Sequence, residues 1–223
     1  AWLRLPSEPC HRLLDVQFTL ACRVRLHLNV PTGSGYCKHR RPDGSVCGAV
    51  LDAKGFHARC CPVGGWLVRR HNAGCAVLAE WAEQYGECTV FREQILPGAS
   101  PDHAEARMDL IIYSPRVAGA IYVDFTVVSA LTVEAIAKGS ALRDGVASDI
   151  ATQRKEQKYS HCVTWAFAVE DHGRFGEDAV GLIRALAPTE PQLRSKAISA
   201  FHQSIACTLQ RSSADAILAA TCS

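Results

Sequence analysis

What the sequence lacks narrows the classes of protein to which the chain can belong. It contains no apolar run long enough to cross a bilayer, no recognisable signal peptide, no internal repeat and no low-complexity segment. Its formal charge is only +2, so net charge by itself does not indicate a nucleic-acid partner. A DNA-binding surface therefore has to come from local basic clusters, and the candidates are the segments 38–41, 69–71 and 154–158.

Methionine is nearly missing as well. Met108 is the only methionine, and the chain begins at Ala1, which predicts that it is a piece cut from a longer polypeptide. The hydrophobic share of 48% and the charged share of 21% are typical of an ordinary globular protein. A length of 223 residues allows one large domain, or a core with a small appendage.

Cysteine, by contrast, is abundant, with 11 residues in the chain. An odd number without a secretory signal argues against a disulfide framework and for a reducing compartment. We therefore expect some of the cysteines to be metal ligands. Others stand among apolar neighbours and are expected to be small buried side chains, namely Cys22, Cys75, Cys162 and Cys207.

Hydrophobic periodicity and turn residues predict an alternation of helices and strands. Helical spacing of apolar positions occurs at 11–28, 66–85, 147–160 and in a tail from about 177 that is interrupted near 188–191. Strands are expected at 88–94, 107–113, 119–128 and 162–169, with a loop at 95–106. This order predicts an α/β fold.

Two of these strands form a predicted hairpin in which each strand carries one carboxylate. A turn centred between Arg116 and Val117 places Asp109 directly opposite Asp124. Two like charges on a mostly buried hairpin repel each other unless a cation lies between them, and hard oxygen ligands suit Mg²⁺ or Mn²⁺. The alternative is that one aspartate caps a strand end while the other pairs with Arg107 or Arg116.

A Cys/His-rich segment precedes this hairpin. Cys37, Cys47, His57 and Cys61 are separated by nine, nine and three residues, a set of ligands that can close a tetrahedral zinc site. Cys60 is an alternative to Cys61 as the fourth ligand. Because four protein ligands leave no open position, we expect such a site to be structural. The competing interpretation is a set of unrelated thiols and a surface histidine.

Lys155 and Lys158 lie one turn apart on a predicted helix, and Tyr159 follows them. A solvated helix face is the simpler interpretation of two such lysines. However, the helix follows the aspartate hairpin and precedes another strand, so it can pack beside the hairpin and bring an ammonium group to its carboxylates. Positive charge at that place would stabilise the transition state of phosphodiester cleavage.

Taken together, these motifs resemble the PD-(D/E)xK nuclease core, and more narrowly the restriction-like endonuclease domain of early-branching, site-specific non-LTR retrotransposons. The resemblance is carried by Arg107-Met-Asp109, by Tyr-Val-Asp124 and by Lys155-x-x-Lys158-Tyr159, together with a preceding Cys-Cys-His-Cys knuckle and the sequences Gly64-Gly65 and Arg70-His71-Asn72. These motifs cover about 37–175, and their order and spacing are more specific than any one of them.

The resemblance implies a restriction-endonuclease-like core, with a mixed sheet flanked by helices, a small N-terminal zinc knuckle and a helical C-terminal tail. It implies four segments: a helical linker from a preceding domain at 1–35, the knuckle at 36–65, the endonuclease core at 66–187 and C-terminal helices at 188–223. Zinc would be structural, and Mg²⁺ or Mn²⁺ catalytic.

The site residues follow in the same way. By resemblance, Asp109 and Asp124 bind the catalytic metal, Lys155 and Lys158 stabilise the transition state and orient water, and Tyr159 contacts the scissile phosphate or buttresses the helix. Candidates for DNA contact are Arg70, His71 and Arg107. A glutamate on the first core helix, Glu80 or Glu83, is a further candidate.

The resemblance implies a DNA endonuclease domain that nicks double-stranded target DNA in the nucleus, so that the exposed 3′-hydroxyl primes reverse transcription. Its partners would be a covalently linked reverse transcriptase domain and the element RNA, with no membrane. Two other functions stay open: a structure-specific nuclease of the Holliday-junction resolvase type, and a nucleic-acid-binding module with an inactive site.

The sequence departs from the family pattern at three places. Met108 stands where the motif has proline, Thr126 stands where the wider superfamily carries lysine, and the interval between Asp124 and Lys155 is long. Activity therefore depends on the lysines of the helix, and an insertion is expected around 130–146.

Overall fold

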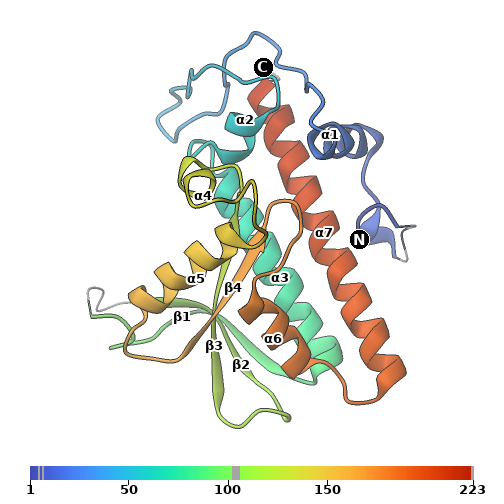
Figure 1. The fold of residues 1–223 in the computed structure, drawn as a ribbon, viewed down its shortest axis with the longest axis vertical. Coiled ribbons are helices and arrows are strands. Elements are labelled where there is room, and N and C mark those ends of the chain that lie inside the picture. The colour runs from blue at the N-terminus through green and yellow to red at the C-terminus, as the bar shows by residue number, and fades with distance from the viewer. Residues whose placement is uncertain (5, 7, 102–105, 222–223) are drawn as a thin grey trace. The chain divides into compact units, whose positions relative to one another are not determined.

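The computed structural model describes residues 1–4, 6, 8–101 and 106–221 (Figure 1). Within these ranges, twelve elements follow one another: η1 (Pro9–His11), α1 (Asp15–Arg25), α2 (Phe56–Cys60), α3 (Trp66–Gly86), β1 (Thr89–Ile95), β2 (Arg107–Tyr113), β3 (Ala120–Val128), α4 (Val133–Ala137), α5 (Val146–Lys158), β4 (Thr164–Glu170), α6 (Glu177–Leu186) and α7 (Pro191–Thr221). The predicted α/β class is confirmed. Residues 102–105 of the predicted loop lie outside the described part of the chain.

The four strands form one mixed sheet in the order β1-β2-β3-β4. The pairs β1–β2 and β2–β3 are antiparallel, whereas β3 and β4 are parallel. In the hairpin, Leu110 pairs with Val123 and Tyr113 pairs with Ala120, which is the register predicted for a turn centred after Arg116. The chain returns from β3 to β4 through α4 and α5, because parallel neighbours require a crossover connection.

Helices cover both faces of the sheet. The helix α5 packs on β3 and β4 on one face (Figure 1). On the opposite face, α3 approaches the ring of Phe125 at Gly74, and α6 approaches Trp165 at Gly181. Phe125 is also stacked on Phe167 of β4, with ring centroids 5.4 Å apart. A glycine at each approach lets the helix backbone come close to a large aromatic ring.

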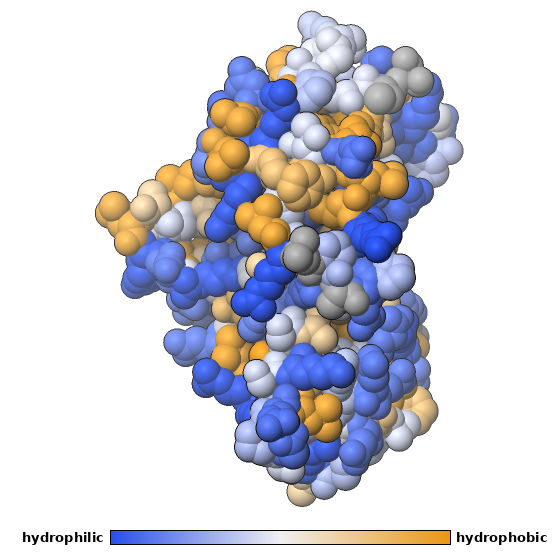
Figure 2. Space-filling view, turned by 90° about the vertical axis from the view of Figure 1, so that its right-hand side faces the viewer, coloured by the Kyte–Doolittle hydropathy of each residue, from blue (hydrophilic) through white to orange (hydrophobic). Residues whose placement is uncertain are grey.

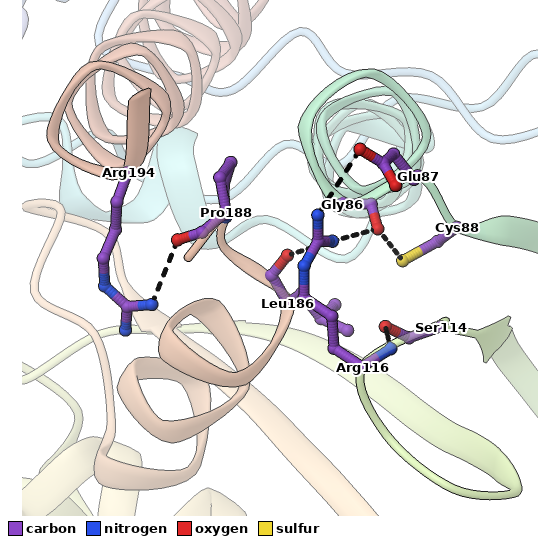
Figure 3. A network of polar contacts seen from close by, with 8 residues as sticks. All are labelled: Gly86, Glu87, Cys88, Ser114, Arg116, Leu186, Pro188 and Arg194. Carbon is purple, nitrogen blue, oxygen red and sulfur yellow. Dashed lines mark hydrogen bonds and ion pairs between the residues drawn. The ribbon is translucent and has the colours of Figure 1, made fainter. Parts of the chain in front are cut away.

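The turn of the hairpin fastens the ends of two helices (Figure 3). The guanidinium of Arg116 donates to the carbonyl oxygen of Gly86, at the end of α3, and to that of Leu186, at the end of α6. It also lies 3.6 Å from the carboxylate of Glu87. A cation at the C-terminus of a helix satisfies carbonyl groups without helical partners and interacts favourably with the helix dipole.

The chain forms two compact units. The first comprises residues 1–73 and 206–223, and the second comprises residues 74–205, which include the whole sheet. The helices α3 and α7 contribute residues to both units. Among the described residues of the first unit, one core cluster joins Leu20 and Val24 of α1, Cys37 and Cys61 of the Cys/His segment, and Ile217 of α7.

The first unit contains two local differences from the prediction. The helix expected at 11–28 is shorter, because the backbone is extended at Leu14 and α1 begins only after it; the Gln17 side chain accepts from the Leu14 N–H group. The helix ends before His27, which has a positive φ of 52°. The short helix α2 was not expected, although Asp52 is a typical capping residue ahead of it.

No helix in the described ranges combines the length and the apolar composition that crossing a membrane would require.

Candidate active site and metal-ligand cluster

The strands β2 and β3 part at the position of the two aspartates. Their last pair is Leu110 and Val123, so Asp109 and Asp124 are the next residues in the same register. Here an Asp109 carboxylate oxygen accepts a hydrogen bond from the backbone N–H of Phe125 at 2.7 Å. The side chain of Asp109 thus replaces a bond of the ladder and ties the parting strands together.

Asp124 is a buried carboxylate with two lysine partners. Only 3% of the residue is exposed, and Lys155 Nζ lies 2.5 Å from its Oδ1 atom while Lys158 Nζ lies 3.8 Å from its Oδ2 atom. Such a group requires a compensating positive charge when it is removed from water. The sequence left two arginines as alternative partners. The structure instead pairs Arg107 with Glu93 at 3.3 Å.

The lysines reach Asp124 because of the face that α5 presents to the sheet. Its buried residues include Ile150 and Ala151, and Lys155 lies one turn after Ala151 on the same side of the helix. In the sheet under this helix, the residue of β4 that pairs with Asp124 is the small Ala166. The Lys155 side chain is 24% exposed, so α5 buries most of its stem while delivering its ammonium group.

Tyr159 ends α5 and supports the second lysine. It is 1% exposed, its hydroxyl donates to the carbonyl of Arg107 at 2.9 Å, and it accepts from Lys158 Nζ at 2.6 Å. Burial, followed by the hydrogen bond and charge of Asp124, raises the pKa of Tyr159 far above its usual range. Tyr159 therefore remains protonated at neutral pH and buttresses the end of the helix, one of the two roles expected from the resemblance.

Sequence reasoning did not place Cys75 near the aspartates. This buried residue of α3 has a raised pKa, first because of burial and then because of the negative charges of Asp109 and Asp124. Its apolar sequence context indicated only a buried thiol. Only the packing of α3 against the sheet brings it to the carboxylates.

The remaining predicted site residues are placed as follows. Glu80 is exposed and lies 4.0 Å from Arg92, and no group of three or more potential metal ligands among the described residues contains it. Arg107 is exposed, and its carbonyl anchors the tyrosine hydroxyl. Arg70 is 7% exposed, which leaves little of its guanidinium for a phosphate, and His71 is half-buried on α3.

The four predicted zinc ligands converge in the first unit. One ligand atom from each of Cys37, Cys47, His57 and Cys61 lies within 4.8 Å of the others. The sulfur atoms of Cys37 and Cys61 are 3.9 Å apart, and that of Cys47 is 3.5 Å from His57 Nε2. Zinc–sulfur bonds of about 2.3 Å place tetrahedral ligands about 3.8 Å apart, so the distances fit a zinc ion. Cys61 occupies the position for which Cys60 was the alternative.

The surroundings of the cluster orient its ligands. Asp52 accepts hydrogen bonds from the N–H groups of Lys54, Phe56 and His57, and this caps α2, the helix that carries His57. Burial raises the pKa of Asp52, but the hydrogen bonds from these three N–H groups outweigh that effect. The pKa of Asp52 is therefore lowered from its ordinary value. Burial raises the pKa of Cys61 to about 12, so the thiol needs a cation to ionise at neutral pH.

The last turns of α7 accept hydrogen bonds from the Cys/His segment. The Lys38 N–H group donates to the Ala220 carbonyl at 3.0 Å, and His39 Nε2 donates to the Ala216 carbonyl at 2.9 Å. None of the ten described cysteines forms a disulfide bond. The three thiols of the cluster are therefore in a form that can bind a metal ion.

Comparison with known protein families finds no family model that matches the chain, and comparison with curated proteins finds no match either.

Proposed function

We propose that the chain is a metal-dependent DNA endonuclease domain, which nicks double-stranded target DNA by hydrolysing a phosphodiester bond. The observation that carries this proposal is the buried Asp124 carboxylate, with Lys155 and Lys158 beside it and Asp109 next to it in the strand register. Two carboxylates and two ammonium groups at a parting of strands can hold a divalent cation and a phosphate at the same place.

The carboxylates fit Mg²⁺ or Mn²⁺. These ions take oxygen ligands and are commonly held by one or two carboxylates, with water and substrate phosphate completing the coordination. Asp109 and Asp124 would hold the ion. Each carboxylate has about four lone-pair positions, so the bonds to Phe125 and to the lysines leave acceptor capacity on both. When bound, the ion supplies Lewis acidity toward the phosphate and lowers the pKa of a bound water.

The lysines act on the phosphate. Negative charge accumulates on the phosphoryl oxygens as the bond to water forms, and a fixed ammonium group stabilises that charge without having to reorganise. Lys155 is the better-fixed group, because it is the more buried of the two and closer to Asp124. Lys158, held through the Tyr159 hydroxyl, is placed to orient water or a second phosphate oxygen.

The Cys/His cluster is proposed to bind one structural zinc ion, because its four protein ligands would fill a tetrahedral coordination sphere. In the biological setting implied by the sequence resemblance, the domain belongs to a non-LTR retrotransposon polyprotein. Its nick would expose a 3′-hydroxyl that primes reverse transcription of the element RNA by the linked domain in the nucleus.

A nicking assay tests the proposal. Supercoiled plasmid is incubated with the purified chain and Mg²⁺ or Mn²⁺, and the open-circular product is measured. We expect Asp109→Asn and Asp124→Asn to abolish nicking, because each removes a metal-binding charge while keeping an oxygen acceptor. The control is Asp149→Asn, which neutralises an exposed aspartate of the same α5 helix and should nick at the parental rate.

The melting temperatures of both variants are measured as well, to distinguish loss of the metal site from loss of the fold. Asparagine at either position can still accept a hydrogen bond, so both variants should stay folded at the assay temperature. Folded variants without activity support the metal site. Parental nicking by both variants would reject the proposal, as would failure of the parent itself to nick in either metal.

A further inference from the structure

The small net charge of the chain hides a large separation of charge between its two units. The zinc-ligand unit, residues 1–73 and 206–223, has twelve Lys and Arg residues against five Asp and Glu, a formal charge of +7. The other unit, residues 74–205, has twelve against seventeen, a formal charge of −5. A zinc ion with three thiolates would change the first value by −1, because the thiols bind as anions. The first unit therefore remains strongly basic.

Most of this positive charge lies at the surface. Eight of the twelve basic residues in the unit are exposed: Arg4, Arg12, Arg23, Arg25, Arg40, Arg41, Lys54 and Arg69. Exposed apolar side chains lie among the hydrophilic ones, as the face in Figure 2 shows. A large field of one sign on a small unit attracts polyanions and accelerates their association.

The loop cations Arg40 and Arg41 are held by neutral oxygen atoms. Arg40 donates to the Gly44 carbonyl at 3.1 Å, and Arg41 donates to the Val46 carbonyl at 3.2 Å. Of the acidic residues, Asp43 lies near Arg41 but accepts two hydrogen bonds from Ser45, at 2.8 and 2.6 Å. The charge of Arg40 and Arg41 is therefore largely available to a partner.

Two residues, Asn29 and Trp66, each contact two basic or histidine side chains that are distant in the sequence. Arg23 donates to the Asn29 carbonyl at 2.8 Å, and Lys54 donates to the Asn29 side chain at 2.9 Å, so these two cations share one anchoring residue. The Arg69 guanidinium lies 4.6 Å over the Trp66 ring, which also stacks with a histidine of the metal-ligand segment.

We infer that the zinc-ligand unit binds the phosphate backbone of nucleic acid and supplies most of the binding affinity of the chain. The loop cations Arg40 and Arg41, together with Arg69, form one part of this surface, and Arg23 with Lys54 forms the other. The inference rests on the proposed function only for the choice of duplex DNA as the target. The zinc-ligand unit would then supply the binding affinity, and the unit with the aspartates would carry out the hydrolysis. The net negative charge of that second unit does not favour the binding of a phosphate backbone.

Binding measured without added Mg²⁺ or Mn²⁺ tests this inference independently of cleavage. The probes are a duplex DNA and a single-stranded RNA of equal length, followed by fluorescence anisotropy at several salt concentrations. For the triple variant Arg40→Gln, Arg41→Gln, Arg69→Gln, we expect a salt dependence shallower by roughly two to three phosphate contacts and affinity lower by about a hundredfold at low salt. Zinc content is measured in each variant, because Arg41 also helps to shape the loop.

The matched control removes positive charge from the other unit. Arg143→Gln with Lys196→Gln changes exposed residues of that unit and should leave both affinity and salt dependence nearly unchanged. Arg40→Lys with Arg41→Lys keeps the charge and should bind like the parent. Binding to RNA with the same residue dependence supports the inference and adds RNA as a partner.

Three results would overturn it. The first is equal loss of affinity in the control variant and in the triple variant. The second is parental binding by a triple variant that retains its zinc. The third is residue-dependent binding to vesicles of phosphatidylserine and phosphatidylcholine that is tighter than binding to either nucleic acid, since that would indicate a membrane surface instead. Because no arm of the test measures cleavage, a protein that binds in this way but never nicks would reject only the proposed function.

Discussion

Lys155 Nζ lies 2.5 Å from Asp124 Oδ1, so a buried carboxylate of the sheet is neutralised by a lysine that the following helix delivers. A solvated helix face, the simpler interpretation of the lysine pair, does not describe this contact, since the Lys155 side chain is 24% exposed. The same pair has two consequences. It places a positive charge against a carboxylate that is buried away from water, and in the proposed mechanism it holds an ammonium group beside the phosphate.

Neutralising the lysines should slow cleavage without weakening DNA binding. We expect Lys155→Ala to reduce the cleavage rate at saturating DNA by about a hundredfold or more, and Lys158→Ala by less, because Lys155 is closer to Asp124 and more buried. Single-turnover nicking and anisotropy measure the two effects separately. As a control, Lys138→Ala removes an exposed lysine that pairs with Glu134 and should cleave at the parental rate.

A lysine that only contributes to binding would show the opposite pattern, with weaker affinity, altered salt dependence and an unchanged cleavage step. Parental cleavage by both lysine variants would remove them from the proposed mechanism and direct attention to Thr126, which stands where the wider superfamily carries lysine.

The two adjacent cysteines should differ in their contribution to zinc binding. Cys61→Ser is expected to lower zinc content from one ion per chain and to reduce the melting temperature, because Cys61 is 1% exposed and belongs to the ligand group. Cys60→Ser should retain the zinc, since Cys60 is not in that group. Elemental analysis and thermal unfolding measure both. Equal zinc loss in the two variants would contradict the assignment of the fourth ligand.

Replacing one buried carboxyl should stabilise the protein in a pH-dependent way. Burial raises the pKa of Glu170 above its ordinary 4.5, although Arg174 lowers it in part, and Glu170 Oε1 has no hydrogen-bond partner among the described residues. A raised pKa means that the folded state favours the protonated form, so stability declines as pH rises through the folded-state pKa. Glu170→Gln mimics that form and should stabilise the fold by roughly 1 kcal/mol at pH 7.

The advantage of Glu170→Gln should shrink at pH 4, where the parent also carries the proton. Urea unfolding at the two pH values measures this change. Glu177→Gln, in the exposed first turn of α6, provides the control and should show no stabilisation at pH 7. An equal gain at both pH values would indicate that burial of the charge is not the cause.

Close packing of α3 on the sheet should make one glycine indispensable. A Cβ atom at Gly74 would overlap the Phe125 ring, so we expect Gly74→Ala to destabilise the protein by about 1–3 kcal/mol despite the higher helix propensity of alanine. Nicking should decline as well, because the Phe125 N–H group holds Asp109. Gly181→Ala is the milder comparison, since its Cβ would lie 3.0 Å from Trp165. Urea unfolding ranks the two, and a neutral Gly74→Ala would contradict the packing.

The predicted strands, the hairpin register and the helix with the lysines could be read from the sequence because they depend on local patterns. Strand periodicity and a turn centred after Arg116 fix which residues face one another, and this placed Asp109 beside Asp124. Helical spacing likewise placed Lys155 and Lys158 one turn apart on the same helix. The spacing of the Cys and His residues predicted the four side chains that converge in the structure, with Cys60 left as an alternative to Cys61.

Other features required contacts between residues far apart in the chain. Nothing local in the sequence indicates that Cys75 lies near the aspartates, or that Tyr159 donates to the Arg107 carbonyl, because side-chain packing decides both. The same applies to α7, whose last turns close the metal-ligand segment by accepting hydrogen bonds from Lys38 and His39.

By itself, therefore, the sequence determined the α/β class, the strand register and the identity of the candidate ligands, since each follows from periodicities of two to four residues or from the chemistry of the side chains. Only the tertiary structure decided that Cys61 completes the metal-ligand group and that Asp124 pairs with lysines rather than arginines. It also decided that one unit carries an excess of positive charge and the other an excess of negative charge. These outcomes depend on which distant segments bury their apolar faces together, and no local pattern specifies that.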